Sequence, residues 1–215
     1  MRKSECPMKL FLNVFLLIVS WNFFMMADIT DNFDALEKEG RLLQRGEWHL
    51  KDGVAHVESS EEIYKKYNNH GPIIKWSEAF VDGVLEVDFK PTDVNRVVFT
   101  YNGDGHIFRI TFAKLPEPGA KKVFVTTRMI AWAEKSSKQN KGTTIKPVNM
   151  PELSDLNKKW NHLKFSCIKG KGVLEMGDFV YEFEHEALKR KKTQIMVSIG
   201  LGTLSVKNMT FKEVD

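Results

Sequence analysis

Cysteine is scarce in this sequence, with two residues among 215, at positions 6 and 167. Cys6 falls in an apolar leader, so Cys167 stands alone in the remainder of the chain. That remainder therefore has neither an intramolecular disulfide nor a zinc site built from several cysteines. Cys167 alternates with Leu163 and Phe165, which is the pattern of a small buried residue in a strand.

An excess of one charge is also lacking. The chain has 32 basic and 28 acidic residues and a net charge of +4. Residues 1–27 hold three of the basic and one of the acidic residues, which leaves 29 against 27 and a net charge of +2. Nucleic-acid-binding domains carry a basic patch or stripe, whereas the one basic cluster here, residues 189–192, lies in a connection between strand patterns. We expect no nucleic-acid partner.

Long apolar runs are absent except at the start of the chain. Three basic residues stand among the first nine, residues 10–26 are almost wholly apolar, and Ala27 precedes Asp28. This order predicts a secretory signal peptide over residues 1–27, a secreted or periplasmic protein, and no membrane span after processing. A membrane anchor is the alternative, because a run of about 17 residues is at the lower limit of a span. The absence of a second basic flank favours the signal peptide.

Helical periodicity is rare, and the best candidates are a helix over Phe33–Gln44 and a single turn within Pro151–Lys158. Elsewhere apolar residues recur at every second position, which indicates half-buried strands. The expected strands are a hairpin over Trp48–Val57, then Ile73–Trp76, Val81–Phe89, Arg96–Tyr101, His106–Lys114, Val123–Trp132, Trp160–Ile168, Val173–Met176, Phe179–Phe183, Gln194–Ile199 and Thr203–Lys212. Residues 134–150 are rich in Lys, Ser, Asn and Gly and predict a long exposed loop, a candidate lid.

About ten short strands separated by close turns predict an all-β fold, a sandwich or jelly roll of two antiparallel sheets. The sequence shows neither an internal repeat nor a linker. Residues 28–215 are therefore expected to form one domain that follows the signal peptide.

Several segments resemble one known family. Residues 48–55, with the sequence WHLKDGVA, resemble the W-x-x-x-D-G-V hairpin that opens keto-disaccharide hydrolase domains. Residues 68–76 and 104–112 resemble the middle strands of these secreted bacterial domains, and residues 202–211 resemble the closing strand. The resemblance implies a concanavalin A-like lectin/glucanase jelly roll. It also implies a sugar-handling protein that cleaves glycosides already oxidised to a ketone at C3.

That activity sets requirements for the site. A ketone at C3 acidifies the proton at C2, so that a base can remove it, the glycosidic oxygen can leave by elimination, and water can then add. Such a site needs a base, a cation or donor at the enolate oxygen, and an acid for the leaving group. His70 and His106 are the candidate bases, Arg109 is the candidate partner of the enolate oxygen, and Tyr101 is the candidate acid.

The two candidates in the strand after residue 105 conflict in their alternation. His106 has the parity of Phe108, Ile110 and Phe112, whereas Arg109 has the opposite parity. They can line one pocket only if a β-bulge intervenes. Either histidine also has a structural alternative, as a turn cap for His70 and as a residue at the edge of the core for His106.

Substrate contacts are predicted at four further residues. Trp132 and Trp76 are candidate platforms for a sugar ring, with core packing as the alternative for each. Arg128 shares the face of Trp132, and Asn69 lies in the polar turn before residue 73.

The sequence predicts no metal site and identifies no cofactor. The turn over residues 102–105 has too few oxygen ligands for calcium. Glu86 and Asp88 resemble the start of a glucanase acidic strand, but Lys90 and Pro91 follow where a third carboxylate is needed, so ordinary glucanase activity is not expected. Two hypotheses remain open, both with a carbohydrate or glycoside ligand. One is a secreted hydrolase or lyase that acts on 3-keto-sugars, and the other is a non-catalytic carbohydrate-binding jelly-roll module.

Overall fold

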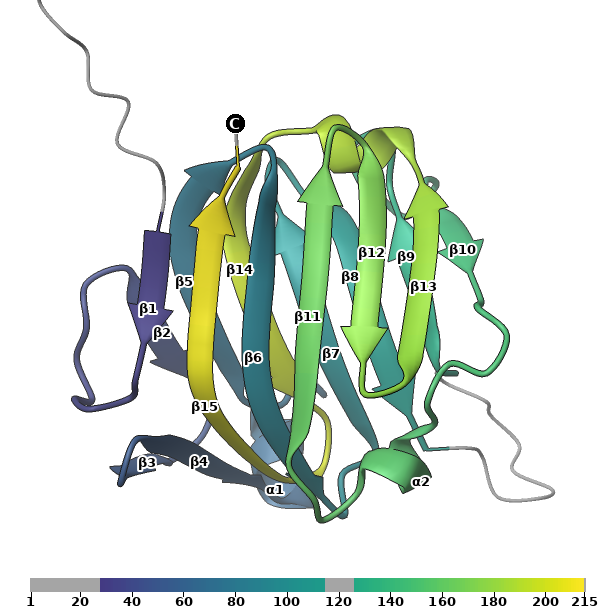
Figure 1. Cartoon of the computed structure of the whole chain (residues 1–215). Coiled ribbons are helices and arrows are strands. Elements are labelled where there is room, and N and C mark those ends of the chain that lie inside the picture. Colours follow the sequence, from purple (N-terminus) through teal and green to yellow (C-terminus); the bar gives the residue numbers. More distant parts are fainter. Residues whose placement is uncertain (1–27, 115–125, 215) are drawn as a thin grey trace, which may run out of the picture.

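Two antiparallel β-sheets face each other in the computed structural model, which describes residues 28–114 and 126–214 (Figure 1). The expected all-β jelly-roll sandwich of two antiparallel sheets is confirmed. The predicted signal peptide lies outside the described residues, as do the first three residues of the strand expected over Val123–Trp132. Among the described residues, no helix is both long and apolar enough to cross a membrane.

Sheet A has eight strands within the described part of the chain. In spatial order they are β13 (Phe179–Glu184), β12 (Lys171–Met176), β11 (Asn161–Ile168), β6 (Gly83–Thr92), β15 (Gly202–Glu213), β4 (Val54–Ser59) and β3 (Trp48–Lys51), with β1 (Asp28–Asp31) also paired to β15. Sheet B has seven described strands. In spatial order they are β10 (Thr143–Ile145), β9 (Arg128–Ala131), β8 (His106–Ala113), β7 (Arg96–Asn102), β14 (Lys192–Ile199), β5 (Ile73–Phe80) and β2 (Arg41–Gln44).

The core lies between the two sheets and follows the alternation of the strands. Along β6 every second residue from Gly83 to Pro91 is buried, as the sequence predicts for a half-buried strand. Aromatic rings from both sheets meet in the middle, where Phe108 of β8 stacks on Phe165 of β11 with 4.7 Å between ring centroids. Since each such side chain contributes roughly 1.5–3 kcal/mol on burial, this layer is the main source of stability.

Local expectations are mostly confirmed. The hairpin of β3 and β4 turns through Asp52 and Gly53, whose φ angles of 52° and 74° suit a two-residue hairpin loop. The single helical turn expected near residue 151 is α2 (Leu153–Leu156).

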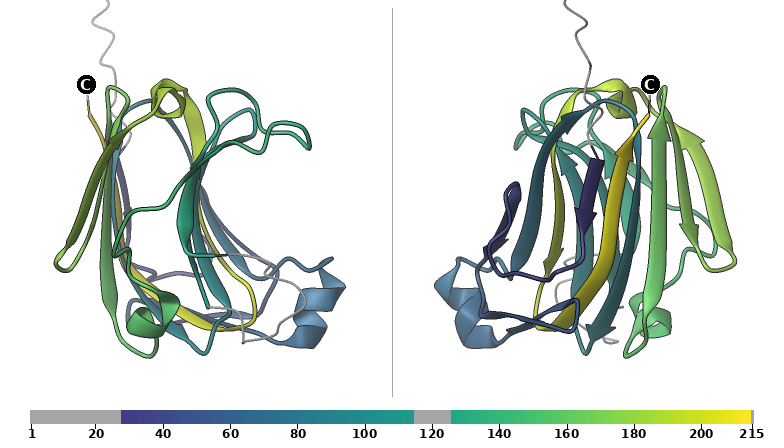
Figure 2. Two further views of the ribbon diagram at one scale, coloured as in Figure 1. Left: turned by 90° about the vertical axis from the view of Figure 1, so that its right-hand side faces the viewer. Right: turned by 60° about the vertical axis from the view of Figure 1, so that its left-hand side comes forward.

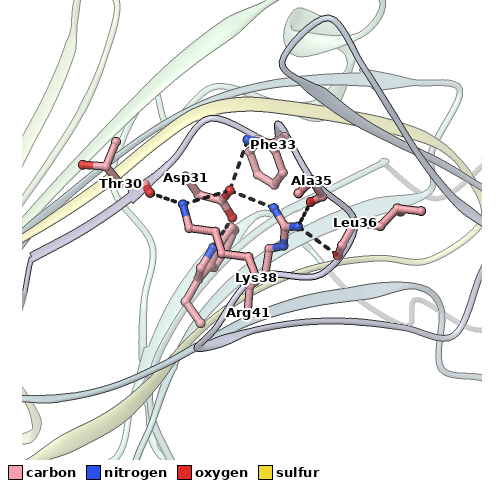
Figure 3. Close-up of polar contacts among 8 residues, drawn as sticks. Thr30, Asp31, Phe33, Ala35, Leu36, Lys38 and Arg41 are labelled. Atoms are coloured by element: carbon pink, nitrogen blue, oxygen red, sulfur yellow. Dashed lines mark hydrogen bonds and ion pairs between the residues drawn. The ribbon is translucent and has the colours of Figure 1, made fainter.

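The helix predicted over Phe33–Gln44 is wrong. Phe33 has a φ of 53° and Gly40 a φ of 75°, and residues 41–44 form β2. The physical reason is a buried cluster around Asp31, whose carboxylate accepts hydrogen bonds from the backbone N–H of Phe33 (3.1 Å) and from Nη1 of Arg41 (2.8 Å) (Figure 3). These bonds hold the segment as an irregular strap across the edge of the sandwich.

Both carboxylate oxygens of Asp31 accept hydrogen bonds, whereas Nε of the buried Arg41 has no acceptor. The second oxygen of Asp31 accepts from Nε1 of Trp76 at 2.8 Å, and Lys38 approaches the first at 3.6 Å. The Arg41 guanidinium also donates to the carbonyl oxygens of Ala35 and Leu36 (Figure 3). The Asp31 and Arg41 side chains are fully buried, so a buried ion pair joins the two ends of the strap, and the bond from Trp76 fixes the strap to β5.

Two helical elements were not predicted, nor were the short strands β1 and β10. Helix α1 (Glu61–Lys66) begins at Ser60, whose Oγ accepts from the N–H of Ile63 at 3.2 Å. An N-cap serine followed by two glutamates, with two lysines in the last turn, is a readable helix signal. A 3₁₀ turn, η1, covers Glu186–Lys189. The loop expected over residues 134–150 is also shorter, because residues 143–145 form β10 and pair with β9.

Candidate functional site

The outer face of sheet B is flanked at both ends. Figure 2 (left) shows the loop between β9 and β10, residues 133–142, reaching out beyond one end of this face and α1 beyond the other. The side chains that point outward from the central strands, by their pairing register, are Arg96, Val98, Thr100 and Asn102 of β7, His106, Arg109 and Thr111 of β8, and Arg128 and Ile130 of β9.

A β-bulge decides what β8 presents on this face. Tyr101 pairs with Phe108, but Asn102 pairs with His106, so Ile107 is an extra residue on β8. Such a bulge places residues three apart on the same side of the strand. The condition that a β-bulge must intervene is therefore met, and His106 and Arg109 meet on the outer face.

His106 is held between two partners. Nη2 of Arg109 lies 2.8 Å from its Nε2, and Oδ1 of Asn102 lies 2.8 Å from its Nδ1. A guanidinium can only donate, so Nε2 accepts and the proton sits on Nδ1, which donates to Asn102. Burial, and next the positive charge of Arg109, lower the pKa of His106 to about 4. The ring is therefore neutral at physiological pH.

Arg109 lies among positive charges. Its guanidinium carbon is 5.6 Å from the centre of the Trp132 ring, which the His106 ring also contacts at 5.5 Å. Burial lowers the pKa of Arg109, and the charges of Arg96 and Arg128 lower it further. Arg96 donates to the hydroxyl of Tyr64 in α1 at 3.0 Å.

The three arginines lack acidic partners. Within residues 28–114 and 126–214, no carboxylate forms an ion pair with Arg96, Arg109 or Arg128. The Nε atoms of Arg109 and Arg128 are buried and have no hydrogen-bond acceptor. We call this part of the outer surface of sheet B, around these three residues, the arginine face.

Trp132 is largely covered. Only 5% of it is exposed, and its visible edge lines an open hollow of about 340 Å³ together with His106 and residues of the β9–β10 loop, which are Ser136, Ser137, Lys138, Asn140 and Lys141. Gly142 passes close to the indole, where a Cβ would lie 2.8 Å from Nε1 of Trp132. In this arrangement Trp132 supports Arg109 and His106 and offers a ligand only its edge.

The base of the β9–β10 loop is fixed to its neighbours. The N–H of His106 donates to Oγ of Ser136 at 2.8 Å. Arg190 donates to the carbonyl oxygens of Trp132 (2.6 Å) and Glu134 (2.9 Å) and also bonds the carboxylate of Asp104. One side chain thus joins the β7–β8 turn, the loop and the segment after η1.

Four of the eight residues predicted from the sequence come together: His106, Arg109, Arg128 and Trp132. His70 and Asn69 do not join them, because they follow α1 at the other end of sheet B, where His70 is exposed and its Nδ1 lies 2.9 Å from the carbonyl oxygen of Asn68. Tyr101 and Trp76 lie in the core. Tyr101 packs on Phe80 and Phe165, and burial raises its pKa well above the usual value.

Sequence reasoning missed Arg96, Asn102 and Tyr64. Period-two alternation along β7 assigns Arg96 and Asn102 to one face and was the available signal. The pairing of Tyr64 with Arg96 joins α1 to the sheet, and no local pattern encodes it.

Acidic groups cluster elsewhere. Glu86 and Asp88 face outward from sheet A, where His162 contacts both, with its Nδ1 2.8 Å from Oδ1 of Asp88. They lie on the opposite side of the sandwich from the arginine face. The described residues include no group of three or more His, Cys, Asp or Glu side chains that could hold a metal ion.

Comparison with solved structures supports the architecture. The CBM2 module of an evolved Dit protein from Lactobacillus casei BL23 phage J-1 has a TM-score of 0.64 at 9% identity, covering 88% of this chain and 98% of that one. A Bacillus licheniformis β-glucanase has a TM-score of 0.58 at 14% identity, covering 87% and 98%. The exoplasmic/lumenal domain of VIP36, bound to Ca²⁺ and Man3GlcNAc, has a TM-score of 0.57 at 10% identity, covering 87% and 88%.

At these identities the similarity establishes the fold, which is the jelly roll of lectins, glucanases and carbohydrate-binding modules. No protein-family model matches the chain, and the curated proteins include no match to it.

Proposed function

We propose that this protein is a carbohydrate-binding jelly-roll domain that holds its ligand on the arginine face. The observation that carries the proposal is the group of three arginines on one outer surface, none of which forms an ion pair with a carboxylate of the described residues. Their unpaired charge suits a ligand that supplies hydrogen-bond acceptors, because hydrogen bonds from a charged donor are the stronger ones. The solved structures of similar fold include a CBM2 module and a VIP36 domain bound to Man3GlcNAc, which supports a sugar as that ligand.

The site has the means to orient a sugar. Arg109 is fixed from one side by His106 and from below by Trp132. Because His106 is neutral and Asn102 fixes its tautomer, the hydrogen bond from Arg109 to His106 persists over the physiological pH range. Few convergent polar groups beside an aromatic edge are the usual composition of a small-ligand site.

A second candidate function is hydrolysis or lysis of 3-keto-glycosides. The observation in its favour is the 2.8 Å contact of His106 with Arg109, which puts a candidate base beside a cation suited to an enolate oxygen. Two observations weigh against it. The pKa of about 4 makes His106 a weak base at neutral pH, and both of its ring nitrogens are engaged. Catalysis would require Arg109 to move from His106 to the substrate.

The first test is glycan binding by the purified full-length protein. We expect wild-type protein to bind at least one member of a broad glycan panel, and Arg109→Gln to weaken that binding roughly 10- to 100-fold, as expected for loss of a charge-assisted hydrogen bond. Lys51→Gln is the matched control, because Lys51 is exposed on sheet A and loses the same charge. Failure to bind any glycan at millimolar concentration would reject the proposal.

The same preparation separates binder from enzyme. Incubation with aryl glucosides and their C3-oxidised forms should leave the aglycone attached if the domain only binds sugar. Release of the aglycone from the keto form, lost in His106→Ala, would instead establish the second candidate.

We also infer from residues 1–27 that the protein is secreted or periplasmic. Expression of the full chain in a host that exports it should yield a mature protein that begins at or close to Asp28. Recovery of the intact leader in a membrane fraction would favour an anchor.

A further inference from the structure

The described side chains of the arginine face carry positive charge and no negative charge. The outward positions of β14, β7, β8 and β9 include no aspartate or glutamate among the described residues. Lys75 of β5 adds a further cation on the same side, paired across β14 to the row of Thr100 and Arg109. A neutral sugar would leave this charge uncompensated.

Arg109 and Arg128 are close enough for both side chains to contact the same ligand group. Arg128 pairs with Thr111, which is two residues from Arg109 on the neighbouring strand. Side chains in such diagonal positions start roughly 7–8 Å apart, a separation that two long guanidinium side chains can span. Thr111, the direct partner of Arg128 across the two strands, is itself buried.

The free donors suit a planar acceptor. Nη2 of Arg109 is bound to His106, and the Nε atoms of Arg109 and Arg128 are closed off from solvent, so the remaining Nη N–H groups are those that a ligand can meet. The planar fork of donors on a guanidinium matches the two coplanar oxygens of a carboxylate. A sugar hydroxyl can use only one donor of that fork and brings no negative charge.

We propose that the ligand is an acidic glycan and that Arg109 and Arg128 together bind the carboxylate of a uronic acid residue. This inference rests on the carbohydrate-binding function proposed above and adds its substrate class. Binding would relieve the repulsion among Arg96, Arg109 and Arg128 that the empty face carries.

Calorimetric titration of the full-length protein tests the proposal. The probes are oligosaccharides of galacturonic, glucuronic and mannuronic acid, each as the free acid and as its methyl ester, with neutral glucose and mannose oligosaccharides and a sulfated galactan oligosaccharide alongside. We expect one free acid to bind roughly 10- to 100-fold more tightly than its ester, because the ester loses the charge and one of the two acceptor positions. The advantage should shrink as salt rises, since both partners are partly exposed.

Charge-conserving variants separate bidentate recognition from simple attraction. Arg109→Lys and Arg128→Lys should each reduce the preference for acid over ester roughly tenfold, because lysine offers a point charge and no fork. Lys51→Arg, on the exposed edge of sheet A, is the control and should leave the preference unchanged. Melting temperatures of all variants exclude a folding defect as the cause.

Each remaining outcome is decisive. Equal affinity for acid and ester, or a preference for neutral oligosaccharides, overturns the acidic ligand while carbohydrate binding stands. Tighter binding of the sulfated probe than of any uronate overturns the carboxylate assignment. If both lysine variants keep the wild-type preference for acid over ester, the proposal that Arg109 and Arg128 together bind the carboxylate is overturned. Binding of no saccharide overturns this inference and the proposed function together.

Discussion

The Asp31 cluster and the arginine face are both built from arginine side chains, but they differ in what surrounds the charge. In the Asp31 cluster, Arg41 is fully buried and meets a carboxylate at 2.8 Å as well as the carbonyl oxygen of Leu36 at 2.9 Å. On the arginine face, Arg109 and Arg128 have other arginines as neighbours and no carboxylate among the described residues.

The difference separates two uses of the same side chain. A buried ion pair holds two segments of the chain together, and removing one partner leaves a buried charge without its counter-charge. Cations that lie together without counter-charges repel one another and lower the stability of the fold. Natural proteins tolerate such a loss of stability at functional sites. The presence of a carboxylate partner, more than the presence of positive charge, thus distinguishes the structural arginine from the proposed binding ones among the described residues.

The largest effect is expected when the Asp31 cluster is broken. Asp31→Ala leaves Arg41 buried without its counter-ion and should lower the free energy of unfolding by about 3–5 kcal/mol, measured by urea denaturation. Asp28→Ala in the same strand is the control, because Asp28 is exposed, and it should change the free energy by less than about 0.5 kcal/mol.

The double variant Asp31→Leu/Arg41→Met sharpens this test. Because neither charge remains, it should recover part of the stability that Asp31→Ala loses. A loss of under about 1 kcal/mol in Asp31→Ala would show that the pair is not the anchor of the strap.

An effect of intermediate size is expected when the pH is lowered, because His106 beside the arginine face becomes harder to protonate on folding. The pKa of His106 is lowered to about 4 in the folded protein, against about 6.5 in an unfolded chain. Between these values the unfolded state binds more protons, so stability is full above pH 6.5, falls as pH drops toward 4, and levels off below that. After allowance for solvent screening of the half-exposed ring, the loss is on the order of 1 kcal/mol.

Denaturation curves between pH 4 and 7 check this expectation. His106→Gln should show a shallower loss of stability toward acid than wild type, whereas His70→Gln, at an exposed turn, should run parallel to wild type. Burial also lowers the pKa of His185, which adds the same background slope to every variant. Identical slopes for wild type and His106→Gln would contradict the electrostatic account of the site.

The smallest effect is expected from Arg128→Gln. Removing one of three like charges should leave the free energy of unfolding unchanged within about 0.5 kcal/mol or raise it slightly, and the small gain should disappear in high salt. Thermal melts at low and high salt measure it. A loss above about 1 kcal/mol would mean that Arg128 has a structural role and would remove the contrast with Arg41.

The fold was predictable because its signals are local and repeated. Alternation along β6 and β8 and the Asp52–Gly53 turn assign strands and a hairpin without knowledge of partners. Half of the candidate site was also predicted by residue type. The predictions that were wrong or left open concern features that depend on a single inserted residue or on contacts with residues distant in the sequence.

One extra residue, Ile107, reverses which side of β8 His106 occupies, and alternation cannot reveal such a bulge. The false helix over Phe33–Gln44 failed for a different reason. Its backbone follows bonds to Asp31, whose own position is fixed by Trp76, 45 residues away in sequence. Tyr101 shows the limit of choosing by chemistry alone, since its hydroxyl is buried in the core and has no partner.

The order of the strands has a consequence for the synthesis of the chain. Strand β14 lies between β7 and β5, and β15 lies between β6 and β4, so each sheet has a gap at its centre until residues 192–213 have left the ribosome. The halves on either side of each gap cannot pair with one another beforehand. We therefore expect the nascent chain to stay open and dependent on chaperones until translation is almost complete, and then to close both sheets together, slowly, as the many pairings between distant segments require.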